Sequence, residues 1–344
     1  MSTMQRTANF FGIHTMIFQS SNIDQHLDWA HHLVGDGGYI KQLFGPVTRE
    51  TQGPDENFIK ILEGVYKRNL IPIIRICGIF KGEYWLKPDA TGPRDYSELA
   101  QAVKRVFEKI PYKEGVPVYV EVFNEPNLLH EWGEETPDPI EYGHLLVQVS
   151  QALKSIREPR IKVVNGSLSP GGNYNNIQFV EDMIKNVPES LWAFDYWGTH
   201  PYPYNHPPEY NNHDKTSLYK DFTIDSYTLE LEVLEKYGRK DVKIIITETG
   251  YELGNDIYRE EGYPPIDDEN RTDYITRAFR DYWSQWPEII AVCPFEMVAV
   301  ESGNWQRFDW IYIDSGSGEN GYPTHTYPQY DAVAALPKPG LAQI

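Results

Sequence analysis

The sequence predicts an α/β protein built as a single (β/α)8 TIM barrel with extended βα loops. Short apolar runs alternate with amphipathic helical patterns along almost the whole chain, and there are eight of each. A typical barrel takes about 250 residues. The 344 residues of the chain therefore leave room for long loops. No linker or low-complexity segment divides the sequence, so we expect one domain over residues 1–344.

The expected strands are short runs rich in β-branched and aromatic residues. They are residues 10–14, 39–44, 71–77, 118–123, 161–165, 193–199, 242–247 and 289–295. The alternative architecture, an open doubly wound sheet, should carry a glycine-rich turn after its first strand. The chain reads TMIFQSSNID at that point, which favours the barrel.

The expected helices have one apolar face and charges placed to suit the helix dipole. They are residues 23–34, 55–69, 96–110, 140–157, 176–187, 218–237, 268–286 and a shorter 327–336. In the second, Phe58, Ile61 and Val65 share a face, with acidic residues in the first turn and basic residues in the last. Strands that alternate with helices in this way are expected to be parallel and covered by the helices.

Composition excludes several classes of partner. The formal net charge is −19, from 50 acidic and 31 basic residues, so nucleic acid and anionic membrane surfaces would be repelled. No apolar run approaches the roughly 18 residues of a membrane-spanning helix. The N-terminus shows no apolar leader, so we expect a cytoplasmic protein as the sequence is written, or a secreted one if a leader has been removed. Cys77 and Cys293 lie in apolar runs and are expected to be free, buried thiols.

Polar residues close the apolar runs, at the strand ends where barrel active sites lie. They are His14, Arg75, Asn124, Glu125, His200, Tyr202, Glu248 and Glu296. Each has an ordinary explanation when taken singly, because Glu248 fits a helix cap, His200 a structural hydrogen bond and Arg75 a structural ion pair. Their convergence on one rim predicts a site rich in carboxylates.

Three of these strand ends resemble the motifs of clan A glycoside hydrolases, the (β/α)8 superfamily that contains family 5. Asn124-Glu125-Pro126 ends the fourth run, Glu248 ends the seventh in IIITETG, and His200-Pro201-Tyr202 follows the sixth. The resemblance implies a retaining β-glycoside hydrolase that cleaves β-linked glucan, mannan or xylan chains without metal or cofactor.

The same resemblance implies a role for each matched residue. Glu125 would be the acid/base and Glu248 the nucleophile. Asn124 would bind the sugar 2-hydroxyl, Tyr202 would hold an oxygen of the nucleophile, and His200 would line the glycon subsite. Cleavage of this kind needs two carboxyl groups about 5 Å apart, whose repulsion raises the pKa of one of them.

The sequence departs from the clan pattern at two points. Lys41 lies on the second strand where many members carry an arginine, and the nearest arginine is Arg75 on the third. No tryptophan directly follows the eighth strand, which leaves Trp305 or Trp310 as the sugar platform. Trp85 and Trp132, on other strand-end loops, are further candidates for sugar contacts.

Two other functions remain open from the sequence. One is a metal-dependent barrel hydrolase that uses His14, His200, Glu125 and Glu248, although the first strand lacks the paired histidines typical of such enzymes. The other is a non-catalytic carbohydrate-binding barrel, which the retention of both glutamates disfavours. Within the glycosidase hypothesis, Glu296 and Glu301 are rivals for the nucleophile. The sequence leaves the sugar, the linkage and the oligomeric state open.

Overall fold

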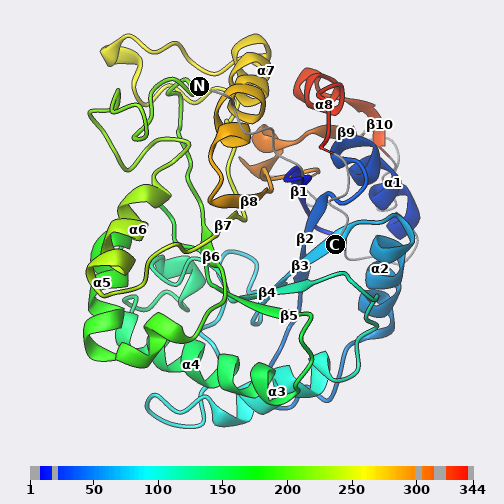
Figure 1. Ribbon diagram of the computed structural model, residues 1–344, viewed down its shortest axis with the longest axis vertical. Coiled ribbons are helices and arrows are strands. Elements are labelled where there is room, and N and C mark those ends of the chain that lie inside the picture. Colours follow the sequence, from blue (N-terminus) through cyan, green and yellow to red (C-terminus); the bar gives the residue numbers. More distant parts are fainter. Residues whose placement is uncertain (1–7, 18–21, 299–303, 314–322, 340–344) are drawn as a thin grey trace.

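The strands surround a common centre and the helices lie outside them (Figure 1). The computed structural model describes residues 8–17, 22–298, 304–313 and 323–339. Neighbouring strands pair in parallel and in chain order, β1 to β5 in one sheet and β6 to β8 in another. Their bounds are β1 Gly12–Thr15, β2 Tyr39–Phe44, β3 Ile71–Ile76, β4 Val118–Val122, β5 Ile161–Asn165, β6 Trp197–Thr199, β7 Ile244–Ile246 and β8 Ile289–Val292.

Two parallel backbone bridges join these sheets into a ring. Val164 on β5 bridges Tyr196, which directly precedes β6. Phe11, which directly precedes β1, bridges Val292 at the end of β8. The N–H of Val292 also donates to the carbonyl of Phe10 at 2.9 Å. The predicted barrel is therefore confirmed.

The helices form the outer shell of the barrel. They are α1 Ile23–Val34, α2 Glu56–Lys67, α3 Ser97–Phe107, α4 Pro139–Ser155, α5 Asn176–Asn186, α6 Tyr227–Lys236, α7 Asp268–Arg277 and α8 Pro328–Ala334. The side chains of Asp55, Asp138, Asn175 and Asp267 accept backbone hydrogen bonds at the starts of α2, α4, α5 and α7. None of the helices in the described ranges has the length and apolarity to cross a membrane.

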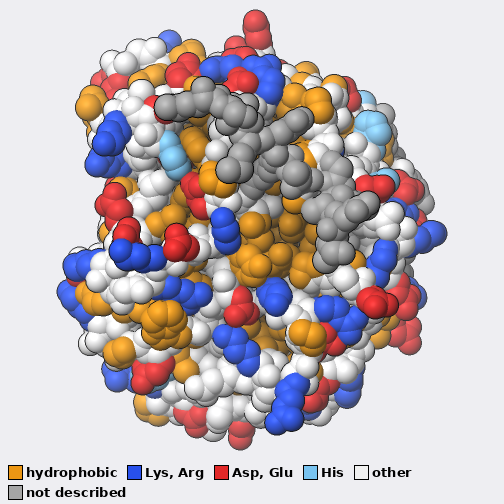
Figure 2. Space-filling model, in the orientation of Figure 1, with side chains coloured by type: hydrophobic (Ala, Val, Ile, Leu, Met, Phe, Trp, Pro, Cys, Tyr) orange, Lys and Arg blue, Asp and Glu red, His pale blue; other side chains and the backbone are white. Residues whose placement is uncertain are grey.

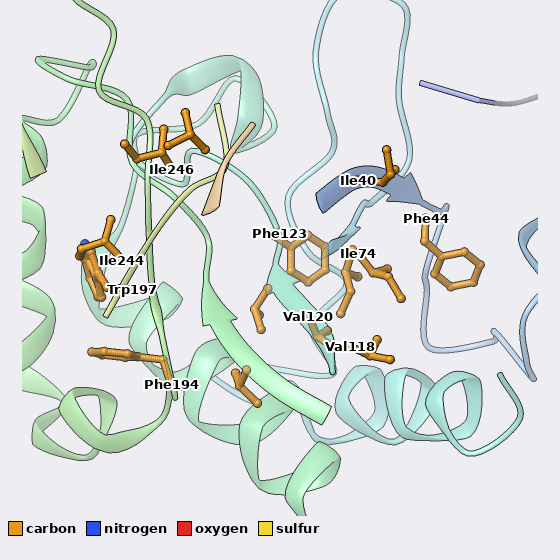
Figure 3. Close-up of a cluster of buried hydrophobic side chains, with 14 of the residues drawn as sticks. Ile40, Phe44, Ile74, Val118, Val120, Phe123, Phe194, Trp197, Ile244 and Ile246 are labelled. Carbon is orange, nitrogen blue, oxygen red and sulfur yellow. The ribbon is translucent and has the colours of Figure 1, made fainter. Parts of the chain in front are cut away.

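The outward-facing strand residues pack against the helices in one apolar layer (Figure 3). Ile40, Ile74, Val118, Val120 and Ile244 are fully buried in this layer. Figure 2 shows acidic and basic side chains interspersed around the periphery of one face of the molecule, with apolar side chains gathered near its centre.

A second apolar cluster fills the inside of the barrel. It contains Tyr39, Ile73, Tyr119, Val164, Ile245, Ala291 and Cys293. Side chains alternate along a strand, so the residue two positions after each of these faces the same interior, one layer nearer the carboxyl end. Lys41, Arg75, Glu121 and Thr247 occupy that higher layer. The apolar cluster is thus the floor on which a polar layer rests.

Several element boundaries differ from the predicted ones. The helix predicted at 218–237 begins only at Tyr227, because the Asp225 carboxylate accepts from the backbone N–H groups of Asn212 and His213 and holds the preceding segment in turns. The helix predicted at 268–286 is α-helical only to Arg277 and continues as a π turn and a 3₁₀ turn. The antiparallel pairing of two strands, β9 and β10 (Ile311–Ile313 and Pro323–Thr326), was not expected. Both cysteines are free and buried, as predicted.

The side chain of His213, in the loop between β6 and α6, contacts both its own loop and the segment that leads into β8. Its Nδ1 lies 2.6 Å from Asp225 Oδ2 and its Nε2 lies 3.0 Å from Glu288 Oε1. The ring stacks on Trp286 with 4.2 Å between centroids. Burial alone would lower the pKa of His213, but the two carboxylates raise it to about 9. The folded chain therefore holds an imidazolium at a pH where an unfolded histidine is neutral.

We expect His213→Gln to lower the melting temperature more at about pH 6 than at about pH 10. The contribution of the imidazolium is fully present below the unfolded pKa of 6.5 and is lost as the pH rises through about 9. Calorimetry of the variant and the parent at both pH values measures the two differences. Trp286→Phe, which keeps the charge and trims the stacked ring, should give a difference that does not vary with pH. Equal differences for His213→Gln would contradict the electrostatic account.

Candidate active site

The backbone turns sharply where β4 ends, and this turn presents the Asn-Glu pair. Phe123 and Glu125 both have left-handed backbone angles, with φ of 64° and 33°. Each such conformation costs on the order of 1–3 kcal/mol and persists only where the surroundings fix it. The N–H of Glu125 donates to the carbonyl of Ser167 at 2.9 Å, which anchors the turn. Asn124 is buried and Glu125 is partly exposed.

Glu248 lies two residues after the end of β7 and is held from several sides. The Nζ of Lys41 lies 2.8 Å from Oε1, and the hydroxyl of Tyr202 donates to Oε2 at 3.0 Å. The Nδ1 of His14, on β1, lies 3.7 Å from Oε1. The structure thus brings together Glu248, Tyr202 and His14, all of which the sequence placed in the site.

The charges around Glu248 decide its protonation state. Burial alone would raise the pKa of Glu248, but the charge of Lys41, the largest of the opposing causes, holds this pKa well below its ordinary value. The group is therefore a carboxylate over a wide range of pH, which suits a nucleophile.

The sequence analysis noted Lys41 only as a departure from the clan pattern and did not single out Glu121, yet both lie in the site. The Nζ of Lys41 lies 3.1 Å from Glu121 Oε2, and both side chains are 0% exposed. Burial alone would lower the pKa of Lys41, but Glu121 and Glu248 together raise it. A usable signal was present, because YIKQLF and VYVEV each carry one charged residue in a mostly apolar strand, and the two charges have opposite signs.

A chain of hydrogen bonds leads from Glu121 to Glu125. The Oγ of Ser167 and the Oγ1 of Thr247 lie 2.7 and 3.0 Å from Glu121 Oε1, and 2.6 Å from each other. The Oγ1 of Thr247 lies 3.0 Å from His200 Nε2. The Nδ1 of His200 lies 2.8 Å from Glu125 Oε1. His200, predicted for the site, is therefore the direct neighbour of the strand-end glutamate.

The two strand-end carboxyl groups face each other closely. One carboxylate oxygen of Glu125, one of Glu248 and a ring nitrogen of His200 all lie within 4.8 Å of one another. Such a group has the donor atoms of a metal site, but Lys41 already supplies a positive charge 2.8 Å from Glu248. A cation bound there would face that ammonium group.

Arg75 contacts Glu131 on the β4 side of the site. Glu131 lies in the 3₁₀ turn Leu129–Glu131. The Nη2 of Arg75 lies 3.1 Å from each oxygen of Glu131, and the Nδ2 of Asn124 donates to Glu131 Oε1 at 2.8 Å. Burial raises the pKa of Glu131 to about 7, with Arg75 opposing and Glu125 adding to the rise. Nothing in the sequence singled out Glu131, because it lies outside the strand ends.

The predicted tryptophans differ in what they can offer a sugar. Trp132 is 1% exposed and packs edge-on against Tyr142, so its ring has no free face and we assign it no sugar contact. Trp85 is partly exposed, lies over the Arg75 guanidinium at 5.2 Å and neighbours the exposed ring of Phe80. Of these three rings, those of Trp85 and Phe80 reach the surface.

The end of β8 contributes the remaining candidates. Trp305 is 56% exposed and stands edge-on to Phe295, whereas Trp310 is buried. Glu296 is fully buried, and its oxygens have no hydrogen-bond partner among the described residues. Burial, followed by the charges of Asp309 and Glu248, raises the pKa of Glu296 to about 9. Glu301 lies outside the described residues.

The ring of eight parallel strands is the fold of several glycoside hydrolases of solved structure, as the sequence resemblance implied. No protein-family model and no curated protein matches the sequence. A family 39 glycoside hydrolase from Bacteroides cellulosilyticus is 15% identical with a TM-score of 0.63, over 95% of this chain and 63% of its own. An endo-β-1,3-glucanase of family 128 from Sorangium cellulosum is 14% identical with a TM-score of 0.58, over 96% of this chain and 99% of its own. A fungal β-1,4-galactanase is 14% identical with a TM-score of 0.59, over 96% of this chain and all of its own.

We expect Lys41→Met to raise the pKa of Glu248, because the variant loses the nearest positive charge. A carboxyl-carbon NMR titration of the folded variant measures this shift. The free energy of unfolding should also fall by about 3–5 kcal/mol, because two buried carboxylates lose their partner. Adding Glu121→Gln to this variant should restore part of the stability. An unchanged titration of Glu248 would contradict the account.

Proposed function

We propose that this protein is a retaining β-glycoside hydrolase that cleaves β-linked glucan, mannan or xylan chains by double displacement. The observation that carries the proposal is the approach of Glu125 and Glu248 within 4.8 Å at the ends of β4 and β7. Retaining pairs stand about 5–5.5 Å apart, whereas inverting pairs stand about 6.5–9.5 Å apart to admit a water. The structural neighbours include a mannanase and a xylanase, which supports a polysaccharide substrate.

In the first step, the Glu248 carboxylate attacks the anomeric carbon and the bond to the leaving oxygen breaks. Glu125 donates its proton to that oxygen, so the leaving group departs as a neutral alcohol. The product is a glycosyl ester on Glu248 and a Glu125 carboxylate. The low pKa of Glu248 supports this assignment, because the attacking group must be ionised.

The hydrogen-bond chain behind Glu125 supports its role as the acid. We assign the single proton of the Thr247 hydroxyl to its contact with Glu121, so that its oxygen accepts from His200 Nε2–H. A neutral imidazole protonated at Nε2 carries a lone pair on Nδ1. That lone pair, rather than an N–H donor, faces Glu125 Oε1 at 2.8 Å, which disfavours the carboxylate and so favours a protonated Glu125 before the leaving oxygen takes the proton.

In the second step, the Glu125 carboxylate takes a proton from a water molecule as the oxygen attacks the anomeric carbon. The ester bond breaks, Glu248 leaves as a carboxylate, and the sugar keeps its original configuration. Lys41 and Tyr202 stabilise the departing carboxylate, at 2.8 and 3.0 Å. The reaction needs only water and two carboxyl groups.

The remaining site residues are proposed to bind the sugar. Asn124 faces the 2-hydroxyl, an interaction that strengthens in the transition state. Glu296 is neutral at pH 7 because of its raised pKa, so it can donate to a sugar hydroxyl. His14 lies beside Glu248, and Trp85 and Trp305 offer ring faces at the rim. A reducing-sugar screen over β-glucans, mannan and xylan identifies which chain is cleaved.

We expect Glu248→Ala to abolish turnover of an activated aryl β-glycoside and azide to restore part of it. Azide can enter the space of the missing nucleophile, which gives a glycosyl azide of inverted configuration. Glu125→Ala should be rescued with retained configuration, because azide then attacks the intermediate on Glu248. NMR of the products distinguishes the two anomers.

Two results would overturn this assignment. A first-formed sugar of inverted configuration would exclude double displacement, and full activity in Glu248→Ala would move the nucleophile to another residue such as Glu296. A parent protein that binds polysaccharide but turns over no aryl glycoside would indicate a non-catalytic barrel.

We expect EDTA to leave the activity intact, because Lys41 occupies the position where a cation would neutralise Glu248. Initial rates on an aryl glycoside before and after chelation measure this. Loss of activity that zinc restores would instead favour the metal-dependent hydrolase, with His200, Glu125 and Glu248 as ligands.

A further inference from the structure

The amide of Asn124 is shared between two carboxyl groups. Its Nδ2 donates to Glu131 Oε1 at 2.8 Å and lies 3.5 Å from Glu125 Oε2. Its Oδ1 is buried and has no hydrogen-bond partner among the described residues. The donor side of the amide is therefore engaged, and the acceptor side is left open.

Glu131 is itself fixed in place. Arg75 lies 3.1 Å from both of its oxygens, and the two side chains are only 7% and 9% exposed. Trp85 covers the guanidinium at 5.2 Å. A carboxylate paired with arginine can only accept hydrogen bonds. The amide nitrogen of Asn124 must therefore face Glu131.

We propose that Glu131 is a positioning residue that sets the direction of the hydrogen bond between Asn124 and the substrate. Held by Arg75, it takes the amide nitrogen and leaves Oδ1 to accept from a sugar hydroxyl. The site then selects a sugar with a free, hydrogen-donating hydroxyl at the position facing Asn124. This inference rests on the proposed function, in which that group is the 2-hydroxyl.

The surroundings explain why Glu131 is needed for this selection. Oxygens of Glu125 and Glu131 and a ring nitrogen of His130 all lie within 4.8 Å of one another, so both carboxyl groups compete for one amide. In Glu131→Gln an amide replaces the carboxylate, and its NH2 group can donate to Asn124 Oδ1, so the amide of Asn124 is no longer held in one direction. It can then present either its nitrogen or its oxygen to the sugar, and discrimination between hydroxyl and hydrogen at that position weakens.

The test compares an aryl β-glycoside with its 2-deoxy analogue, at about pH 8, above the pKa of about 7 of Glu131. The measured quantity is kcat/KM for the aryl β-glycoside divided by kcat/KM for the 2-deoxy analogue. Losses of activity that affect both substrates equally cancel in this ratio. We expect Glu131→Gln to lower this ratio about 5- to 10-fold, the size of one neutral hydrogen bond. Asn124→Ala should lower it as well, and the double variant no further than Asn124→Ala alone.

The outcomes separate the two proposals. A parent enzyme that cleaves neither substrate would refute the proposed function. An active enzyme in which Glu131→Gln lowers both rates equally, or lowers the ratio additively with Asn124→Ala, would refute the role of Glu131 alone. Glu131→Gln leaves Arg75 buried without its charge partner and can unfold the chain. Arg75→Met with Glu131→Gln removes both charges, and the same loss of ratio in this folded variant would support the proposal.

Discussion

The site depends on one buried ammonium group, Lys41, which lies between two carboxylates inside the barrel. Its Nζ is 2.8 Å from Glu248 and 3.1 Å from Glu121. Removing a charge from water costs several kcal/mol unless its partners are close and well placed. Three strands must therefore keep their register, because Lys41 lies on β2, Glu121 on β4 and Glu248 two residues after β7. The apolar floor beneath, with Tyr39 and Tyr119 two residues earlier on β2 and β4, excludes water from the network.

This network also links the two carboxyl groups of the proposed reaction. Glu121 contacts Lys41 on one side and the hydroxyl of Thr247 on the other, and Thr247 leads to His200. A displacement of Glu121 would disturb both the charge beside Glu248 and the hydrogen bond on the acid side. The separation of the two carboxyl groups is therefore set by a polar layer rather than by the loops above it.

The strand order and the strand-end residues followed from the sequence because their signals are local. Alternating apolar runs and helical stripes depend on residues close in the chain. The partnership of Lys41 with Glu121 did not follow, since it depends on the register between strands that are not sequence neighbours. Glu131 was missed because its meaning comes from Arg75 and Asn124 in space. The late start of α6 reflects Asp225, whose carboxylate engages backbone groups 12 and 13 residues earlier.

Two cations in separate positions explain why the second strand lacks the arginine that many clan A members carry there. Lys41 stands beside Glu248, while Arg75 on β3 holds Glu131 on the other side of the site. A lysine can lose its proton when buried, whereas an arginine does not. In the proposed intermediate, Glu248 is a neutral ester and no longer compensates Lys41. Glu121 then remains as its anionic partner at 3.1 Å, so the ammonium group stays charged and is ready to stabilise Glu248 when it leaves as a carboxylate.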